Sequence, residues 1–203
     1  MMSDHDQVSD VSRETMEDLE RFATLVKKWT KKINLISVGS ADAMWTRHIL
    51  DSAQIYHIAP KGDWLDLGSG GGFPGIVASI IAKHKGDTRK FTLVDSDQRK
   101  CVFLRAASRE LDLHATVISG RIESLPAINS PVLSARALAD LTALIGYAEL
   151  HLNPKGVALF MKGKNWLAEH KDAQLVWSYD LEEITSKTDP SAIILKIKDI
   201  RRA

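Results

Sequence analysis

The residues of this sequence best suited to holding a small molecule lie in a glycine-rich run at positions 66–75. Within it, Gly68, Gly70 and Gly72 stand two residues apart, and position 71 is also glycine. Glycine lets a backbone turn tightly and come close to a ligand, and the N–H groups that open a following helix attract polar ligands. The run lies between a short apolar strand predicted at 63–67 and a helix predicted at 74–83. We therefore expect a ligand-binding loop at the carboxyl end of that strand.

The spacing of the glycines narrows the class of ligand. A dinucleotide-binding loop reads G-x-G-x-x-G, which would place its third glycine at position 73. Phe73 stands there instead. The G-x-G-x-G spacing, with Asp66 before it, resembles the first motif of class I methyltransferases. The resemblance implies that Gly68, Gly70 and Gly72 accommodate the methionine part of S-adenosylmethionine.

A second signal is Asp95, at the end of the next predicted strand. A carboxylate there can accept hydrogen bonds from the ribose hydroxyls of a nucleoside cofactor. Asp95 could instead cap the helix that follows, but Asp97 is also placed to do so. We favour ribose binding by Asp95.

The elements that must position these residues alternate along the chain. Alternating strands and helices predict an α/β, Rossmann-like fold with a mostly parallel, doubly wound sheet of seven strands and helices on both faces. Helices are predicted at 74–83, 97–111 and 138–152. Strands are predicted at 63–67, 91–94, 115–118, 132–134, 157–161, 174–181 and 192–198. The last two are close in sequence without an intervening helix, so we expect them to pair antiparallel.

The first 60 residues form a predicted N-terminal helical extension that caps the domain at 61–203. Apolar residues at spacings of three and four predict amphipathic helices at 13–36 and 41–58. Charge is uneven here: residues 1–20 carry seven acidic residues against Arg13, and residues 21–48 carry six basic residues against Asp42. Such runs are usually solvated helix faces.

Composition bounds the class of protein. The chain has 203 residues, of which 44% are hydrophobic, and a net charge of +1, so it suits one domain and is not strongly basic. The single cysteine, Cys101, excludes an intrachain disulfide and a multi-cysteine zinc site. The polar start shows no secretory signal, and no apolar run approaches the length of a membrane span. We expect a cytoplasmic protein that does not associate with membranes.

With these motifs in order, the chain resembles a family: the bacterial 16S ribosomal RNA guanine-N7 methyltransferases, or glucose-inhibited division protein B family. The resemblance runs from about Lys31 to the end, although residues 165–179 carry no motif. Its most specific features are the Phe-Pro-Gly that ends the glycine run and the run Arg-His-Ile-Leu-Asp-Ser at 47–52. The other motifs are at 34–36, 93–96, 100–105, 120–123, 134–137 and 161–164.

The resemblance implies S-adenosylmethionine as cofactor and 16S ribosomal RNA, or the small ribosomal subunit, as partner. It also implies cofactor contacts at Gly68, Phe73, Ile122, Glu123 and Arg136. The segment at 122–123 follows the third predicted strand, where its backbone could read the adenine edge. Glu123 could instead be a plain surface acid.

The chemistry of N7 methylation makes few demands on side chains. Guanine N7 is a lone-pair acceptor without a proton, so the transfer needs positioning and electrostatics but no general base, no covalent intermediate and no metal. The candidates for positioning the substrate are Arg136, Lys162, Lys164 and His48. The two lysines could instead be solvated loop residues, and His48 could simply be packed.

Three alternatives remain open from the sequence. The first is a class I methyltransferase that acts on another RNA, a protein or a small molecule. The second is a nicotinamide oxidoreductase, which Phe73 disfavours. The third is a non-catalytic nucleic-acid module, which would leave the glycine loop unexplained.

For an RNA substrate we expect the basic segment from Arg21 to Arg47 to join Lys162 and Lys164 in one electropositive surface around the cofactor site. The oligomeric state is not fixed by the sequence, which is compatible with a monomer.

Overall fold

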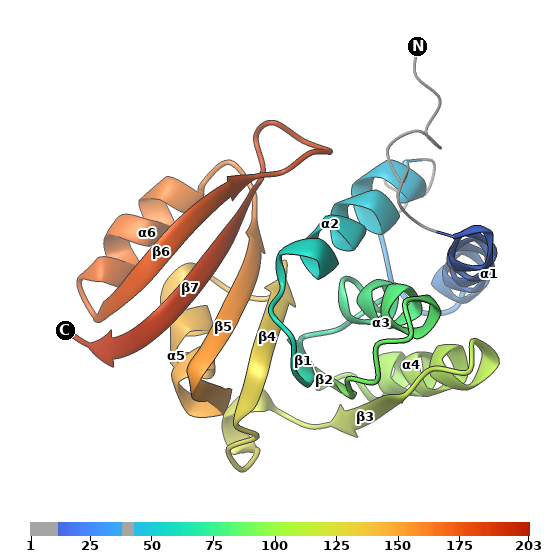
Figure 1. Cartoon of the computed structure of the whole chain (residues 1–203), viewed down its shortest axis with the longest axis horizontal. Coiled ribbons are helices and arrows are strands. Elements are labelled where there is room, and N and C mark those ends of the chain that lie inside the picture. Colours follow the sequence, from blue (N-terminus) through green and yellow to red (C-terminus); the bar gives the residue numbers. More distant parts are fainter. Residues whose placement is uncertain (1–11, 38–42) are drawn as a thin grey trace.

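A seven-stranded sheet forms the centre of the protein in the computed structural model, which describes residues 12–37 and 43–203 (Figure 1). The strand order is β3-β2-β1-β4-β5-β7-β6. β7 is antiparallel to both neighbours, and the other pairs are parallel. The strands are β1 (Trp64–Leu67), β2 (Phe91–Asp95), β3 (Ala115–Ser119), β4 (Ser130–Arg136), β5 (Leu152–Lys162), β6 (Trp177–Thr185) and β7 (Ile193–Arg202).

Helices cover both faces of this sheet and bury two hydrophobic clusters. Within β1, Trp64 belongs to one cluster while Leu65 and Leu67 belong to the other, as the alternation of side chains along a strand requires. Helices α1 (Arg13–Thr30), α2 (Asp51–Ile58), α3 (Gly75–His84) and α4 (Gln98–Glu110), with the π-helical segment η3 (Trp45–Leu50), share the first cluster. Helices α5 (Leu141–His151) and α6 (Trp166–Gln174), with the 3₁₀ turn η4 (Ile122–Ser124), belong to the second.

The structure confirms the predicted fold class, including all seven strands and the antiparallel pairing at the end of the chain. Among the described residues no helix is long and apolar enough to cross a membrane. Three details were wrong. The first helix ends at Thr30, and not at Ile36. The helix expected at 138–152 ends at His151, because Leu152 already begins β5 by pairing with Ser130. Helix α6 was missed, because Ala173 is its only buried residue and its apolar periodicity is weak.

Helix α1 is held on the domain by its apolar face. Leu19, Phe22 and Val26 are fully buried at helical spacing, and the Phe22 ring lies 5.4 Å from that of Phe73 in the glycine run. The Ser12 hydroxyl caps the helix by accepting from the N–H of Thr15. The N-terminal helices therefore share a core with the sheet. The acidic residues before Ser12, Asp42 and the start of the helix predicted at 41–58 lie outside the described residues.

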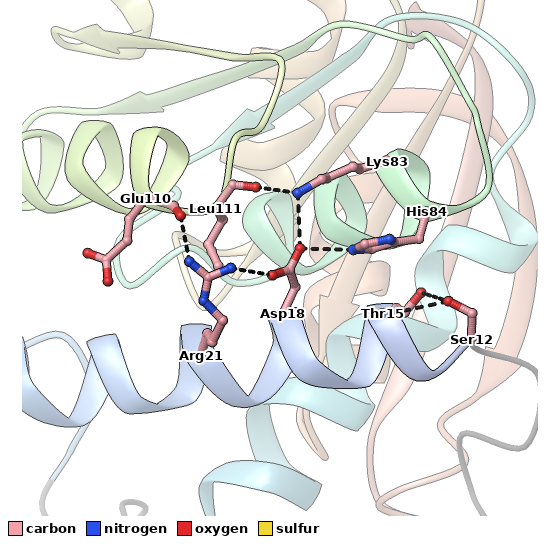
Figure 2. Close-up of polar contacts among 8 residues, drawn as sticks. All are labelled: Ser12, Thr15, Asp18, Arg21, Lys83, His84, Glu110 and Leu111. Atoms are coloured by element: carbon pink, nitrogen blue, oxygen red, sulfur yellow. Dashed lines mark hydrogen bonds and ion pairs between the residues drawn. The ribbon is translucent and has the colours of Figure 1, made fainter.

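A buried carboxylate also fixes α1 at its polar side (Figure 2). Asp18 accepts hydrogen bonds from Arg21 at 2.8 Å, Lys83 at 3.1 Å and His84 at 2.8 Å. Burial alone would raise the pKa of Asp18, but these donors outweigh it and lower the pKa. Lys83 and His84 end α3, and Arg21 also donates to the carbonyl of Glu110 at the end of α4. Asp18 therefore ties α1 to the edge of the domain opposite the glycine loop.

Candidate functional site

Hydrogen bonds of Asp66, near the end of β1, hold the glycine loop that lies between β1 and α3. The carboxylate of Asp66 is fully buried and accepts from the Ser134 hydroxyl at 2.6 Å and from the N–H of Gly75 at 3.2 Å. Burial raises the pKa of Asp66 to about 6. The Ser134 hydroxyl in turn accepts from the indole N–H of Trp64 at 2.8 Å. This chain of bonds fixes both ends of the loop against β4.

The glycines of the loop serve different purposes. A Cβ on Gly68 would lie 2.6 Å from the Leu138 side chain, and one on Gly72 would lie 2.9 Å from the ring of Phe22. These two positions, both at positive φ, are glycine because neighbouring side chains pack against them. Gly70 also has a positive φ, of 51°, but a Cβ there would meet nothing closer than 3.6 Å. Of these three glycines, Gly70 is therefore the one that no side chain packs against closely, and a ligand could approach the loop backbone there.

Asp95 lies directly beside Gly70. Its carboxylate accepts from the N–H of Gly70 at 2.8 Å and from the N–H of Asp97 at 2.8 Å, one bond to each oxygen. The cap of α4 is Asp97, whose side chain accepts from the N–H of Arg99, as the sequence indicated. Each carboxylate oxygen of Asp95 keeps a lone pair for another donor. Ribose binding by Asp95 remains a prediction.

Ile122 and Glu123 lie in η4, after β3, and both are already engaged. The carbonyl of Ile122 accepts from the ring Nε2 of His151 at 3.0 Å and from the N–H of Leu125 at 3.2 Å. Glu123 accepts from the Tyr147 hydroxyl at 2.7 Å, which lowers the pKa of Glu123. Since the Ile122 carbonyl is occupied, an adenine ring could be read here through backbone N–H groups or by the second carboxylate oxygen of Glu123.

Arg136 ends β4 and connects the glycine loop with the N-terminal helices. Its guanidinium donates to the carbonyl of Arg47 at 2.6 Å, lies 3.4 Å from a carboxylate oxygen of Asp51, and has its Cζ 6.0 Å from the centre of the Phe73 ring. The next residue, Ala137, has a φ of 51°, a conformation that costs a non-glycine residue about 1 kcal/mol. The chain therefore turns sharply where Arg136 leaves the sheet.

His48 packs on the same ring. The His48 and Phe73 rings lie 5.1 Å apart, and the Nε2 of His48 is buried without a partner. Burial lowers the pKa of His48 to about 4, and the charges of Arg136 and Arg47 contribute. His48 is thus neutral near pH 7 and supports Phe73, and it is not among the residues that line the cavity described next.

An open cavity of about 380 Å³ lies beside the glycine loop, at the carboxyl ends of β4 and β5. The turn between β6 and β7 closes its far side. No residue of the glycine loop lines this cavity. Arg136 lines the cavity and also lies against the ring of Phe73, so it is the candidate residue that borders both the cavity and the glycine loop. Its charged lining residues include Asp51, Arg136, Lys162, Lys164 and Glu169.

The two candidate lysines of this cavity differ. Lys162 has a side chain only 10% exposed, and its ammonium donates to the carbonyl of Ala139 at 2.9 Å and to Glu169 at 2.5 Å. It is therefore a buried, paired lysine, and the interpretation as a solvated loop residue is wrong for it. Lys164 is exposed at the rim and has no ion pair among the described residues.

Asp51 was not a candidate from the sequence, yet it holds one wall of the cavity. One carboxylate oxygen accepts from Gln54, Ser186 and Thr188, at 2.9, 3.1 and 2.9 Å, and the other faces Arg136. Asp51 and Gln54 lie on one face of α2, while Ser186 and Thr188 lie in the β6–β7 turn. The run at 47–52 thus positions Arg136, Phe73 and this turn together. Only the run itself was visible in the sequence; its partners, 135 and 137 residues away, were not.

The expected basic surface stays a prediction, but the structure places its residues. Arg21 does not contribute, because it pairs with Asp18 at the opposite edge of the domain. The segment that follows α1 does approach the loop, since the carbonyl of Leu35 would lie 3.1 Å from a Cβ on Gly71. Shortly before it in the chain, four lysines are exposed at Lys27, Lys28, Lys31 and Lys32. Within residues 12–37 and 43–203, no group of three His, Cys, Asp or Glu side chains is placed to hold a metal.

Solved structures share this fold at low sequence identity. A SAM-dependent methyltransferase from Aquifex aeolicus superposes with a TM-score of 0.59 at 12% identity, over 86% of this chain and 97% of that one. A TehB-like SAM-dependent methyltransferase from Corynebacterium glutamicum gives a TM-score of 0.56 at 15% identity, over 85% and 97% of the two chains. At such identities the comparison establishes the fold alone.

Sequence relatives are much closer. The ribosomal RNA small subunit methyltransferase G of Ruegeria sp. (strain TM1040) is 55% identical over 95% of both chains. The protein of the same name from Gluconobacter oxydans (strain 621H) is 44% identical over 95% of this chain and 97% of that one. The family model described as rRNA small subunit methyltransferase G, GidB, matches residues 15–192. The chain therefore belongs to the GidB family of rRNA small subunit methyltransferases.

Proposed function

We propose that the protein transfers a methyl group from S-adenosylmethionine to N7 of a guanine in 16S ribosomal RNA. The observation that carries this proposal is the placement of the cavity directly beside the glycine loop, with Arg136 between them. Family membership favours the same reaction. A ribosomal RNA substrate also favours a cytoplasmic location.

The residues around Gly70 fit the proposed cofactor. Gly70 offers an open approach to the backbone, and Asp95 keeps acceptor capacity beside it for the ribose hydroxyls. Phe73, the backbone N–H groups of η4 and Arg136 would border the rest of the molecule. When bound, S-adenosylmethionine supplies an electrophilic methyl group on a sulfonium sulfur.

The chain's own residues would then orient the acceptor and stabilise charge. N7 carries no proton, so no side chain has to remove one, and neutral His48 is not required as a base. Positive charge develops on the guanine ring during the transfer. The carboxylates of Asp51 and Glu169 line the cavity in which the ring would lie, each paired with a basic residue, so the ring would be oriented between fixed charges of both signs.

The test is transfer of labelled methyl groups from S-adenosylmethionine to RNA, followed by mapping of the modified base. Purified small subunits, naked 16S RNA, transfer RNA and total protein would be offered in parallel. We expect label at N7 of one guanine in 16S RNA, with the first two substrates deciding which assembly state is used. Label in transfer RNA, in protein or in no acceptor would contradict the proposal.

A further inference from the structure

The geometry points to the ion pair of Lys162 and Glu169 as the element that selects guanine over adenine in the cavity. This inference rests on the proposed function, because it concerns the base that receives the methyl group. It assigns to Glu169, which no motif of the sequence marked, a part in choosing the substrate.

The pair is built into the wall of the cavity. Lys162 ends β5, and Glu169 lies one turn into α6. Both line the cavity, with side chains 10% and 25% exposed. One oxygen of Glu169, Oε2, accepts from the Lys162 ammonium at 2.5 Å and from the N–H of Leu141 at 2.9 Å. The Lys162 ammonium and the Glu169 carboxylate are therefore fixed in position by contacts from α5, α6 and β5.

Hydrogen-bonding capacity remains on both heads. An ammonium has three protons, and Lys162 uses one on Ala139 and one on Glu169. Of the Glu169 carboxylate, Oε2 has two donors, while Oε1 has no donor among the described residues. One N–H donor and one carboxylate oxygen thus stand side by side at the cavity wall.

The other ion pair of the cavity, Asp51 with Arg136, has its carboxylate more fully engaged. Three donors converge on Oδ1 of Asp51, and Oδ2 faces the Arg136 guanidinium. Arg136 donates to the carbonyl of Arg47 and keeps further N–H groups. This pair therefore offers mainly donors, so it is the less suited of the two to read an edge that carries a donor beside an acceptor.

A donor beside an acceptor matches the edge of guanine and opposes that of adenine. Guanine presents O6, an acceptor, next to N1–H, a donor; adenine presents an exocyclic amine next to an unprotonated N1. Lys162 would donate to O6, and Oε1 of Glu169 would accept from N1–H. With adenine, the ammonium would face an amine and the carboxylate would face a lone pair.

This orientation also presents the correct atom for the reaction. In the sheet, β4 lies between β1, which carries the glycine loop, and β5, which carries Lys162. A guanine held at O6 and N1 on the β5 side turns N7, which lies next to O6 along the edge of the base, toward the β1 side. The proposed cofactor site lies there.

The first test compares Glu169→Gln with the matched control Glu182→Gln. The introduced amide keeps an oxygen for the N–H of Leu141 but loses the charge. Glu182 forms the same kind of pair with Lys196, at 2.9 Å, on β6 and β7 and outside the cavity lining. We expect Glu169→Gln to lower kcat/KM on the guanine substrate by about 10- to 100-fold, while cofactor affinity is kept, and the control to match the wild type.

The decisive test pairs each enzyme with RNA carrying 2-aminopurine at the target position, which keeps N7 but lacks O6 and N1–H. We expect wild type and Glu182→Gln to lose at least tenfold more rate on this substitution than Glu169→Gln does. The ratio of the two substrates within one preparation is independent of how much enzyme is folded. Equal ratios in all three enzymes would overturn the inference while leaving the proposed function intact. Failure of the wild type to methylate the guanine RNA would instead overturn the proposed function.

Discussion

The glycine loop and the cavity beside it are neighbours in space but are built from very different parts of the sequence. The loop is ten consecutive residues, with Asp95 only 25 residues beyond Gly70. The cavity wall joins Asp51 to Thr188 across 137 residues. The proposed cofactor site is thus encoded locally, whereas the proposed acceptor site exists only once the last strands have been added to the sheet.

Gly70→Val acts on the glycine loop alone and should have the largest effect. A branched side chain would fill the open approach and would also be strained at a φ of 51°. We expect affinity for S-adenosylmethionine, measured by calorimetry, to fall by about 100-fold or more. The control is Gly86→Val, which carries the same strain at a φ of 65° with no atom within 4 Å. Equal affinities for the two variants would refute a role for Gly70 in binding.

The second prediction concerns Asp51→Asn, a change in the wall of the cavity. The amide would present N–H groups to Arg136 and so release its guanidinium, while the remaining oxygen can still accept from the β6–β7 turn. We expect kcat on RNA to fall by about 100-fold, because small misplacements of positioning groups have effects of that size. The matched variant is Asp18→Asn, which removes a comparable buried carboxylate at the opposite edge.

Asp18→Asn should lower the free energy of unfolding by about 2–4 kcal/mol without changing kcat of the folded enzyme. Urea titration and rate measurements on the same preparations separate the two effects. If both variants lost only stability, Asp51 would be a second structural anchor of the N-terminal helices and no part of the site.

The same contrast explains what the sequence could reveal. Gly70 and Asp95, which the structure brings together, could be proposed because strand, loop and helix follow one another directly. The run at 47–52 was recognised, but its meaning depends on Ser186 and Thr188, which no local pattern connects to it. Glu169 was missed along with α6, a helix with so little buried surface that periodicity does not mark it. Lys162 was placed at the site, but its pairing with Glu169 could not be foreseen.

Asp66, which holds the glycine loop, and His48, which packs on Phe73, should change the stability of the protein with pH in opposite directions. Asp66 has a pKa raised to about 6, so its contribution to stability is full below about pH 4 and is lost as pH rises through 6. His48 has a pKa lowered to about 4, so its contribution is lost as pH falls from 6.5 toward 4. Urea titrations between pH 4 and 6.5 measure both.

We expect Asp66→Asn to make the free energy of unfolding rise more steeply with pH than in the wild type, and His48→Gln to make it rise less steeply. The conservative replacements keep the size of each side chain, so the change of slope reports the charge. Slopes equal to that of the wild type in both variants would show that neither group is shifted by the fold.

The smallest expected effect is at Lys164, on the rim of the cavity. Lys162 is neutralised by Glu169, so of the two lysines only Lys164 is free to contact a phosphate. Each such contact adds close to one to the slope of log affinity against log salt. Lys164→Ala should therefore flatten that slope by about one and leave cofactor affinity unchanged, whereas Lys171→Ala, at an exposed position on α6 outside the cavity, should change neither. A Lys164→Ala slope equal to that of Lys171→Ala would remove Lys164 from the RNA path. The phosphate contacts would then be sought at Arg47, which is exposed and lines the cavity, and at the exposed lysines around the end of α1.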